Sequence, residues 1–141
     1  MIRVRKIAHA AYEVPDVEQQ TDYYTNILGM TLVGKEKDAT FLANTVDHHS
    51  VVLRKGPQAQ CVRIGFQIGE GDDLGAFEKQ VQGHGIKTQR KKDPEPSISE
   101  LVTFEDPKGT KIEVFAEQAH LAGIVGRRIS AEEYFAEFLE S

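Results

Sequence analysis

Three side chains that could do chemistry stand on segments with the pattern of strands. Residues 62–68 alternate apolar side chains with Arg63 and its polar neighbours, which is the period of a strand with one buried face. His9 and Glu113 lie in segments of the same kind. A guanidinium pairs with carboxylates, whereas imidazole and carboxylate bind metals or move protons. An unpaired buried carboxylate is costly, so Glu113 requires a metal, a cation or a proton.

The elements that carry these residues follow one order twice. A strand, a helix and three strands are predicted at 6–14, 16–29, 30–36, 39–45 and 49–55. The same order follows at 62–68, 71–85, 86–92, 100–106 and 110–116, and DPKG at 106–109 predicts a turn. The repeat defines a first module at about 5–56 and a second at about 61–117. We therefore expect one domain built from two βαβββ modules.

The two predicted helices have recognisable end signals and apolar faces, and Gly83 or Gly85 is expected to end the second helix. Asp16 is a suitable N-cap for the first helix, with Gln19 at the capping-box position, and Gly29 is placed to end it. The apolar faces are expected at Val17, Tyr24 and Leu28 in the first helix and at Leu74, Phe77 and Val81 in the second. The segment KKDPEPS at 91–97, with two prolines, is interpreted as a loop that borders a site.

A tail at 118–141 lies outside the repeat. Its segment ISAEEYFAEFLES predicts a final helix with Ser130 and Glu133 as a capping box. The apolar stripe of this helix consists of Tyr134, Phe135, Phe138 and Leu139. Such a stripe must cover either the sheet or a partner chain.

Composition excludes several classes of protein. The 141 residues carry a net charge of −5, which argues against a nucleic-acid groove. The apolar runs are too short for a membrane span, and the N-terminus has no apolar core of a signal peptide. A single cysteine, Cys61, excludes an internal disulfide framework. We therefore expect a cytoplasmic protein.

Longer motifs carry a family resemblance. The stretch HAAYEVPDV followed by DYYTNILGM is similar to the opening strand and helix of the vicinal oxygen chelate superfamily, and FEDPKGTKIEVF resembles its closing hairpin. This superfamily includes glyoxalase I, bleomycin-resistance proteins and type I extradiol dioxygenases. VDHHSVVLR is closer to the dioxygenase branch, where a similar segment occurs in the non-catalytic domain. The resemblance covers residues 5–117. It implies an α+β fold in which two βαβββ modules form a curled eight-stranded mixed sheet around a shared cavity, with the C-terminal helix added.

The resemblance also implies positions for metal ligands. The extradiol pattern places histidine at positions 9 and 63 and glutamate at position 113, and this chain has His9, Arg63 and Glu113. A guanidinium has no lone pair for a metal, so the triad is incomplete. The glyoxalase glutamate position corresponds to Val52.

Three arrangements of these residues remain open. In the first, Arg63 pairs with Glu113 and no metal is needed. In the second, His48 joins His9 and Glu113 to bind Fe(II), Mn(II) or Zn(II). In the third, Arg63 anchors an anionic substrate. The other residues expected to face the cavity are Gln67, Phe115 and Arg54.

Three functions also remain open. The resemblance implies a dioxygenase-like or glyoxalase-like metalloenzyme that acts on a small aromatic or oxygen-chelating substrate. The alternatives are a metal-free protein that sequesters a small molecule, as bleomycin-resistance proteins do, and a non-catalytic subunit of a dioxygenase. The resemblance also implies a homodimer, with the tail at 118–141 as a contact.

Overall fold

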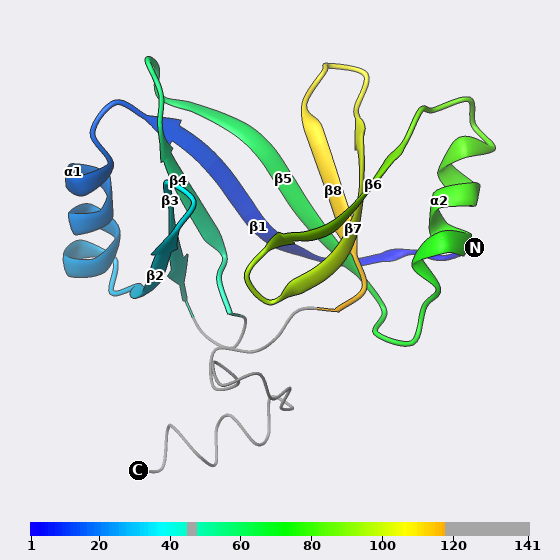
Figure 1. Ribbon diagram of the computed structural model, residues 1–141, viewed down its shortest axis with the longest axis horizontal. Helices are drawn as coiled ribbons and strands as arrows, with labels where there is room; N and C mark the ends of the chain where they lie inside the picture. Colours follow the sequence, from blue (N-terminus) through cyan, green and yellow to red (C-terminus); the bar gives the residue numbers. More distant parts are fainter. Residues whose placement is uncertain (45–47, 118–141) are drawn as a thin grey trace, which may run out of the picture. The chain divides into compact units, whose positions relative to one another are not determined.

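The alternating segments form eight strands, and two helical segments interrupt them. The structure is a computed structural model that describes residues 1–44 and 48–117 (Figure 1). The elements of the first module are β1 (Val4–Val14), α1 (Val17–Asp22), η1 (Tyr23–Ile27), β2 (Thr31–Glu36), β3 (Ala39–Ala43) and β4 (Val51–Lys55). Those of the second are β5 (Gln60–Ile68), α2 (Leu74–Gln82), β6 (Gln89–Glu95), β7 (Ile98–Glu105) and β8 (Lys111–Phe115).

Strand pairing repeats between the two modules. β1 pairs parallel with β4, and β5 pairs parallel with β8. β3 lies antiparallel between β2 and β4, just as β7 lies antiparallel between β6 and β8. The strand order is β2-β3-β4-β1-β5-β8-β7-β6. The α+β class and the eight-stranded mixed sheet with two βαβββ repeats are therefore confirmed.

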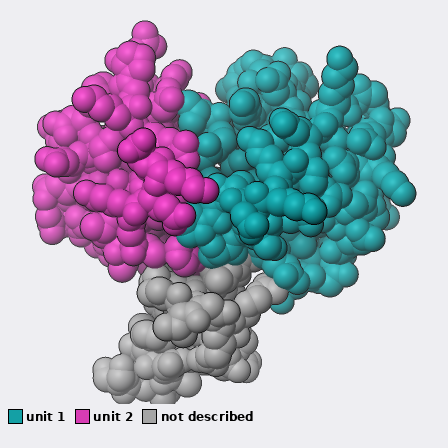
Figure 2. Space-filling view, in the orientation of Figure 1, with its two compact units in different colours: residues 1–9, 62–118 teal, residues 10–61, 119–141 magenta. Residues whose placement is uncertain are grey.

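The chain also divides into two compact units, which Figure 2 colours separately. Unit 1 contains Met1–His9 and Val62–Gln118, and unit 2 contains Ala10–Cys61. The first part of β1 therefore belongs to the same unit as all of the second module from Val62 onward. This exchange places His9 in unit 1 with β6, β7 and β8.

The core of unit 1 has two parts, one on each face of its strands. The part under α2 joins Ile68 and Val114 of the strands to Phe77 and Val81 of the helix, and Leu74 packs against them. The predicted apolar face of the second helix is therefore confirmed. The other part consists of Ala8, Ile98, Leu101 and Phe115. This second part lies beside the candidate site.

Helix α2 begins at a side-chain cap. Asp73 accepts hydrogen bonds from the backbone N–H groups of Gly75 at 2.8 Å and Ala76 at 3.3 Å. We expect Asp73→Ala to lower the free energy of unfolding by about 0.5–2 kcal/mol, because two helix donors lose their acceptor. Urea titration measures this change. Asp73→Asn keeps an acceptor and should retain most of the stability, so an equal loss in both variants would contradict the capping role.

The first helix differs from the prediction. Asp16 caps α1 by accepting from Gln19 N at 3.0 Å, and Gly29 has a φ of 76°, as the sequence indicated. However, the helix changes to a π-turn after Asp22, with a hydrogen bond from Leu28 N to Tyr23 O. The wider turn rotates the following residues, and Leu28 is 56% exposed, so the predicted apolar face is wrong at Leu28, whereas Val17 and Tyr24 are half-buried.

Unit 2 has a strand core of its own. The side chains of Phe41, Leu42, Val52 and Leu53 are almost fully buried. Val52 is therefore part of the hydrophobic core, although it occupies the position of the metal-ligating glutamate in the glyoxalase pattern. The predicted C-terminal helix, its capping box and its apolar stripe lie outside the described residues. Among the described residues, no helix has the length and apolar character needed to span a membrane.

Candidate metal and ligand site

His9 lies at the centre of a buried polar cluster in unit 1. Its side chain is inaccessible to solvent, and Nε2 lies 3.1 Å from Oε1 of Glu113 and 4.0 Å from Oε2 of Glu95. The two carboxylates are each 4% exposed. The predicted neighbours His9 and Glu113 are therefore in contact.

Arg63 belongs to the same cluster, where it contacts both carboxylates. Its Nη2 donates to Oε1 of Glu95 at 2.8 Å, and its Nε lies 3.1 Å from Oε1 of Glu113 in an ion pair. The Arg63 side chain is 17% exposed, so the two contacts are largely protected from water. The expected pairing of Arg63 with Glu113 is present, but the shorter contact goes to a second carboxylate.

Glu95 is the site residue that sequence reasoning missed. The segment around it was expected to be a loop, but β6 continues to Glu95. The register of β6 against β7 shifts between Lys92 and Glu95, and Asp93 has a φ of 48°. Such a bulge redirects the following side chain, so a simple alternation does not reveal which face Glu95 takes. The sequence contained one signal that could have identified Glu95, because it is a charged residue beside two prolines in a segment expected to border a site.

Gly65 and Phe115 hold the His9 ring in place. A Cβ at Gly65 would lie 2.4 Å from Cε1 and 2.5 Å from Nε2 of His9, so the ring rests directly on the glycine backbone. The Phe115 ring is stacked near it, with centroids 5.8 Å apart and planes 11° apart. Phe115 is fully buried, so it positions His9 from within the core. A fixed ring fixes the direction of its nitrogen lone pair or N–H group.

The other predicted cavity residues have different surroundings. The Gln67 side chain is 8% exposed, and its Nε2 donates to the carbonyl of Ala116 at 3.1 Å. Within the described residues its Oε1 has no hydrogen-bond partner. Arg54 belongs to unit 2, where it lines a cavity of about 790 Å³ together with Lys35 and Thr40. Roles for Gln67 and Arg54 in ligand binding stay predictions.

The two adjacent histidines of unit 2 contact each other. His48 Nδ1 lies 3.1 Å from His49 Nδ1, so one ring donates a proton and the other accepts it. His49 is fully buried and packs edge-on against Phe41 at 4.9 Å between centroids. Burial, followed by the charge of His49, lowers the pKa of His48 from 6.5 to about 4. The sequence favoured His48 as the functional member, whereas His49 is the more buried one.

The lowered pKa of His48 predicts a pH dependence of stability. Between pH 6.5 and about 4 the unfolded chain binds a proton at His48 that the folded chain excludes, so stability falls as pH falls through this range. We expect His48→Asn to lose less stability than wild type between pH 7 and 4.5. Urea titrations at several pH values measure the difference. His84→Asn, at an exposed site, is the control and should follow wild type.

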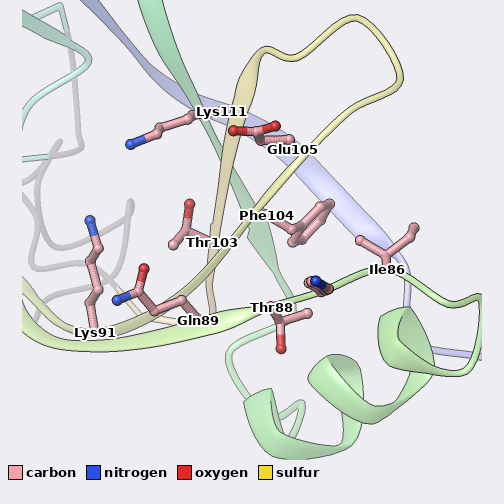
Figure 3. Close-up of a pocket in the computed structure, with 9 residues that line it drawn as sticks. Ile86, Thr88, Gln89, Lys91, Thr103, Phe104, Glu105 and Lys111 are labelled. Atoms are coloured by element: carbon pink, nitrogen blue, oxygen red, sulfur yellow. The ribbon is translucent and has the colours of Figure 1, made fainter.

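A cavity of about 440 Å³ also lies in unit 1 (Figure 3). Residues of β6, β7, β8 and the segment before β6 line it, including Lys91, Thr103 and Lys111. Thr103 is directly opposite Glu113 in the β7–β8 pair, so both side chains project from the same face of the sheet. The cavity therefore adjoins the strand positions that carry the cluster.

The donor set of the cluster fits a divalent cation. Metal bonds of about 2.0–2.2 Å place neighbouring ligand atoms roughly 3.0–3.4 Å apart, which matches the His9–Glu113 separation of 3.1 Å. Ligand-type atoms of His9 and Glu95 also lie within 4.8 Å of each other. Two carboxylates and one guanidinium leave a charge of −1 when His9 is neutral. Either a metal or a proton would compensate this charge.

Comparison with known proteins identifies the family. The model of the Glyoxalase/Bleomycin resistance protein/Dioxygenase superfamily matches residues 6–114. The chain belongs to this superfamily. The resemblance that the sequence motifs carried is therefore confirmed, including its closeness to the extradiol dioxygenases.

The relatives of the chain in this superfamily include ring-cleaving enzymes. It is 24% identical over 115 residues to a manganese-dependent 2,3-dihydroxybiphenyl 1,2-dioxygenase from Geobacillus genomosp. 3, covering 79% of this chain and 36% of the relative. It is similar to an extradiol ring-cleaving dioxygenase from B. fuscum, with a TM-score of 0.77 and 27% identity over 87% of this chain and 35% of that one.

A further match is homoprotocatechuate 2,3-dioxygenase from Brevibacterium fuscum in complex with 3,4-dihydroxyphenylacetate. The TM-score is 0.76 at 28% identity, with coverage of 84% of this chain and 38% of that one. The chain thus spans little more than a third of the length of these relatives. The match establishes an extradiol-dioxygenase-like domain.

Proposed function

We propose that this domain binds a divalent metal through His9, Glu95 and Glu113, and with it a small aromatic ligand that carries two adjacent oxygens. The observation that carries the proposal is the buried imidazole with two carboxylates at separations that suit a metal. The manganese dependence of one relative supports the choice of Mn(II), with Fe(II) and Zn(II) as alternatives. The reaction that we propose is ring cleavage by O₂.

Each residue of the cluster has a distinct task in this proposal. The metal, when bound, supplies Lewis-acid coordination to the two ligand oxygens. His9, Glu95 and Glu113 hold it, and three protein ligands leave positions for a chelating substrate. Arg63 donates to Glu95 and pairs with Glu113, which orients both carboxylates. Phe115 and Gly65 fix the His9 ring.

Charge balance supports an anionic form of the ligand. The two carboxylates and Arg63 together carry −1, and a divalent cation changes the sum to +1. A diol that loses one proton on binding neutralises this charge in a site whose side chains are largely hidden from water. Ring cleavage then consumes one O₂ per diol and places both oxygen atoms in the product, without a further reductant.

An imidazole from residues 48–49 remains our proposal for an additional ligand. The sequence pointed to His48, and the burial of His49 makes it the better-protected ring of the pair. Metal content measured on His48→Ala and His49→Ala separately tests each ring. Full metal content in both variants would restrict the ligands to unit 1.

The ring-cleavage proposal is tested with oxygen consumption. Untagged protein is loaded with Mn(II) or Fe(II) and mixed with 2,3-dihydroxybiphenyl or 3,4-dihydroxyphenylacetate in an oxygen electrode. We expect metal-dependent consumption at one O₂ per diol, and none with Glu113→Gln. Metal-loaded protein that binds a diol without consuming O₂ would refute catalysis by this chain, and would favour a binding or subunit role.

A metal-free binding protein is the second candidate, and Arg63 favours it. The guanidinium already contacts both carboxylates, at 2.8 and 3.1 Å, and thus supplies a positive charge where the metal ligand of the extradiol pattern is missing. Mass spectrometry of metal content separates the two candidates. Less than a tenth of an equivalent after incubation with excess metal and desalting would favour the metal-free protein.

A further inference from the structure

Gln67 carries a buried hydrogen-bond acceptor that the proposed metal site does not use. The side chain is 8% exposed, and its Nε2 donates to the carbonyl of Ala116 at 3.1 Å. A carbonyl can only accept, so this hydrogen bond fixes which end of the amide faces Ala116 and directs Oε1 elsewhere. Within the described residues Oε1 receives no hydrogen bond, and a buried acceptor without a donor lowers stability. The amide is therefore arranged for a donor on its other side.

Strand register places Gln67 beside the His9 ring. Gln67 follows Gly65 by two residues on β5, so both positions face the same side of the sheet. Phe115 of β8 is directly opposite Gln67. The two neighbours of Gln67 on this face, Gly65 and Phe115, are the residues that hold the His9 ring in place. Gln67 thus lies next to a ring whose position is already restricted.

The charge of the cluster determines which nitrogen of His9 carries hydrogen. Nε2 lies 3.1 Å from Oε1 of Glu113, and a metal or a proton must compensate the charge of −1 that the carboxylates and Arg63 leave. A neutral imidazole that binds a metal through Nε2 has its hydrogen on Nδ1. A proton between Nε2 and Glu113 has the same consequence, because an imidazolium and a ring that accepts at Nε2 both carry hydrogen on Nδ1. In either state the ring needs an acceptor on the side of Nδ1.

The acceptor of Gln67 lies within reach of this nitrogen. A Cβ at Gly65 would lie 2.6 Å from Nδ1 of His9, and two residues of a strand separate Gly65 from Gln67 by roughly 7 Å. A side chain that reaches back along the strand covers part of this separation, and one bridging water covers the rest. We propose that Oε1 of Gln67 accepts the Nδ1 hydrogen of His9 through one bridging water, and so directs Nε2 toward the carboxylates.

This contact makes Gln67 a positioning residue that acts through His9. Phe115 and Gly65 restrict the plane of the ring, whereas a hydrogen bond at Nδ1 restricts its rotation within the plane and selects the tautomer. The direction of the Nε2 lone pair is then defined before a metal binds. The inference rests on the proposed function for its effect on metal binding, but the hydrogen bond itself is proposed for the metal-free protein as well.

Replacing Gln67 by leucine and by glutamate tests the acceptor. Leucine is similar in size and has no polar side-chain atom, whereas a protonated glutamic acid donates to the Ala116 carbonyl and retains an acceptor. We expect the affinity for Mn(II), measured by competition with a chelator, to fall about 10–100-fold in Gln67→Leu and to stay within about threefold in Gln67→Glu. Gln89→Leu, at an exposed position of β6, is the control and should match wild type.

The stability of the metal-free variants shows whether Gln67 only packs in the core. Leucine removes the buried acceptor along with the hydrogen bond to Ala116, so the urea midpoint of Gln67→Leu should stay close to that of wild type. A loss of Mn(II) affinity in Gln67→Leu at unchanged stability is the result we expect. Equal Mn(II) affinity in Gln67→Leu and wild type, or equal losses in Gln67→Leu and Gln67→Glu, would overturn the role of the acceptor.

The hydrogen on Nδ1 can be observed without a metal. Proton–nitrogen NMR spectra of metal-free protein labelled at histidine report both ring nitrogens, and comparison with His9→Ala assigns the His9 signals. We expect a Nδ1–H signal protected from exchange in wild type and Gln67→Glu, and its loss in Gln67→Leu. A protected signal that persists in Gln67→Leu would overturn the inference. If wild type binds no Mn(II) while the signal depends on Gln67, the metal proposal is refuted and the positioning of His9 stands.

Discussion

Replacing His9 by alanine is expected to abolish stoichiometric metal binding by this protein. The imidazole is the neutral ligand in a cluster whose other donors are Glu95 and Glu113, and its loss leaves two carboxylates that Arg63 already contacts. Two carboxylates held by a guanidinium are a poor site for Mn(II) or Fe(II). We expect the affinity to fall at least 100-fold, which removes the metal during desalting. Mass spectrometry of wild type and His9→Ala, purified without a tag, measures the metal content.

A matched control separates loss of a ligand from loss of fold. His84 is exposed at the end of α2, and His84→Ala should retain about one equivalent of metal. His9→Ala should also retain the cooperative unfolding transition, although with lower stability because a cavity opens beside Phe115. Equal metal content in wild type and His9→Ala would contradict the proposed site. Absence of metal from both proteins would instead favour the arrangement in which Arg63 serves as the cation.

Much of the fold could be predicted because its signals are local and periodic. Alternation located β5 and β8, and Asp16 and Gly109 marked a cap and a turn that the structure contains. The twofold order of strands and helices was predicted, and the structure shows that the two modules also share their strand pairing. Each of these signals depends on residues close together in sequence, so no knowledge of tertiary contacts was required.

The remaining errors arise where the backbone departs from its regular period. The π-turn after Asp22 changes the residues that face the sheet, and so the face assigned to Leu28 was wrong. The bulge before Glu95 had a larger consequence, because it directs a carboxylate to Arg63. The alternation of apolar and polar residues in a strand does not reveal where a β-bulge inserts an extra residue. The sequence could therefore supply His9, Arg63 and Glu113, but not the second carboxylate of the cluster.

Gly65→Ala is the substitution with the largest expected effect on stability and site together. The new Cβ would lie within 2.6 Å of three atoms of the His9 ring, so the ring must move. Phe115 stacks near the ring and Glu113 contacts Nε2, so movement breaks one of these contacts. We expect a loss of about 1–3 kcal/mol in the free energy of unfolding, measured by urea titration, as is typical of overpacked cores.

Gly34→Ala is the control for Gly65→Ala because both glycines lie within strands. Nothing lies within 4 Å of a Cβ at Gly34, and alanine restricts the unfolded chain, so stability should stay equal or rise by up to about 1 kcal/mol. The metal content of Gly65→Ala shows whether Gly65 positions the His9 ring or only fills space in the core. If Gly65 merely fills space, Gly65→Ala will lose stability but keep its metal below the unfolding temperature. If Gly65 positions His9, the folded variant will lose metal affinity as His9→Ala does, and this is the result we expect.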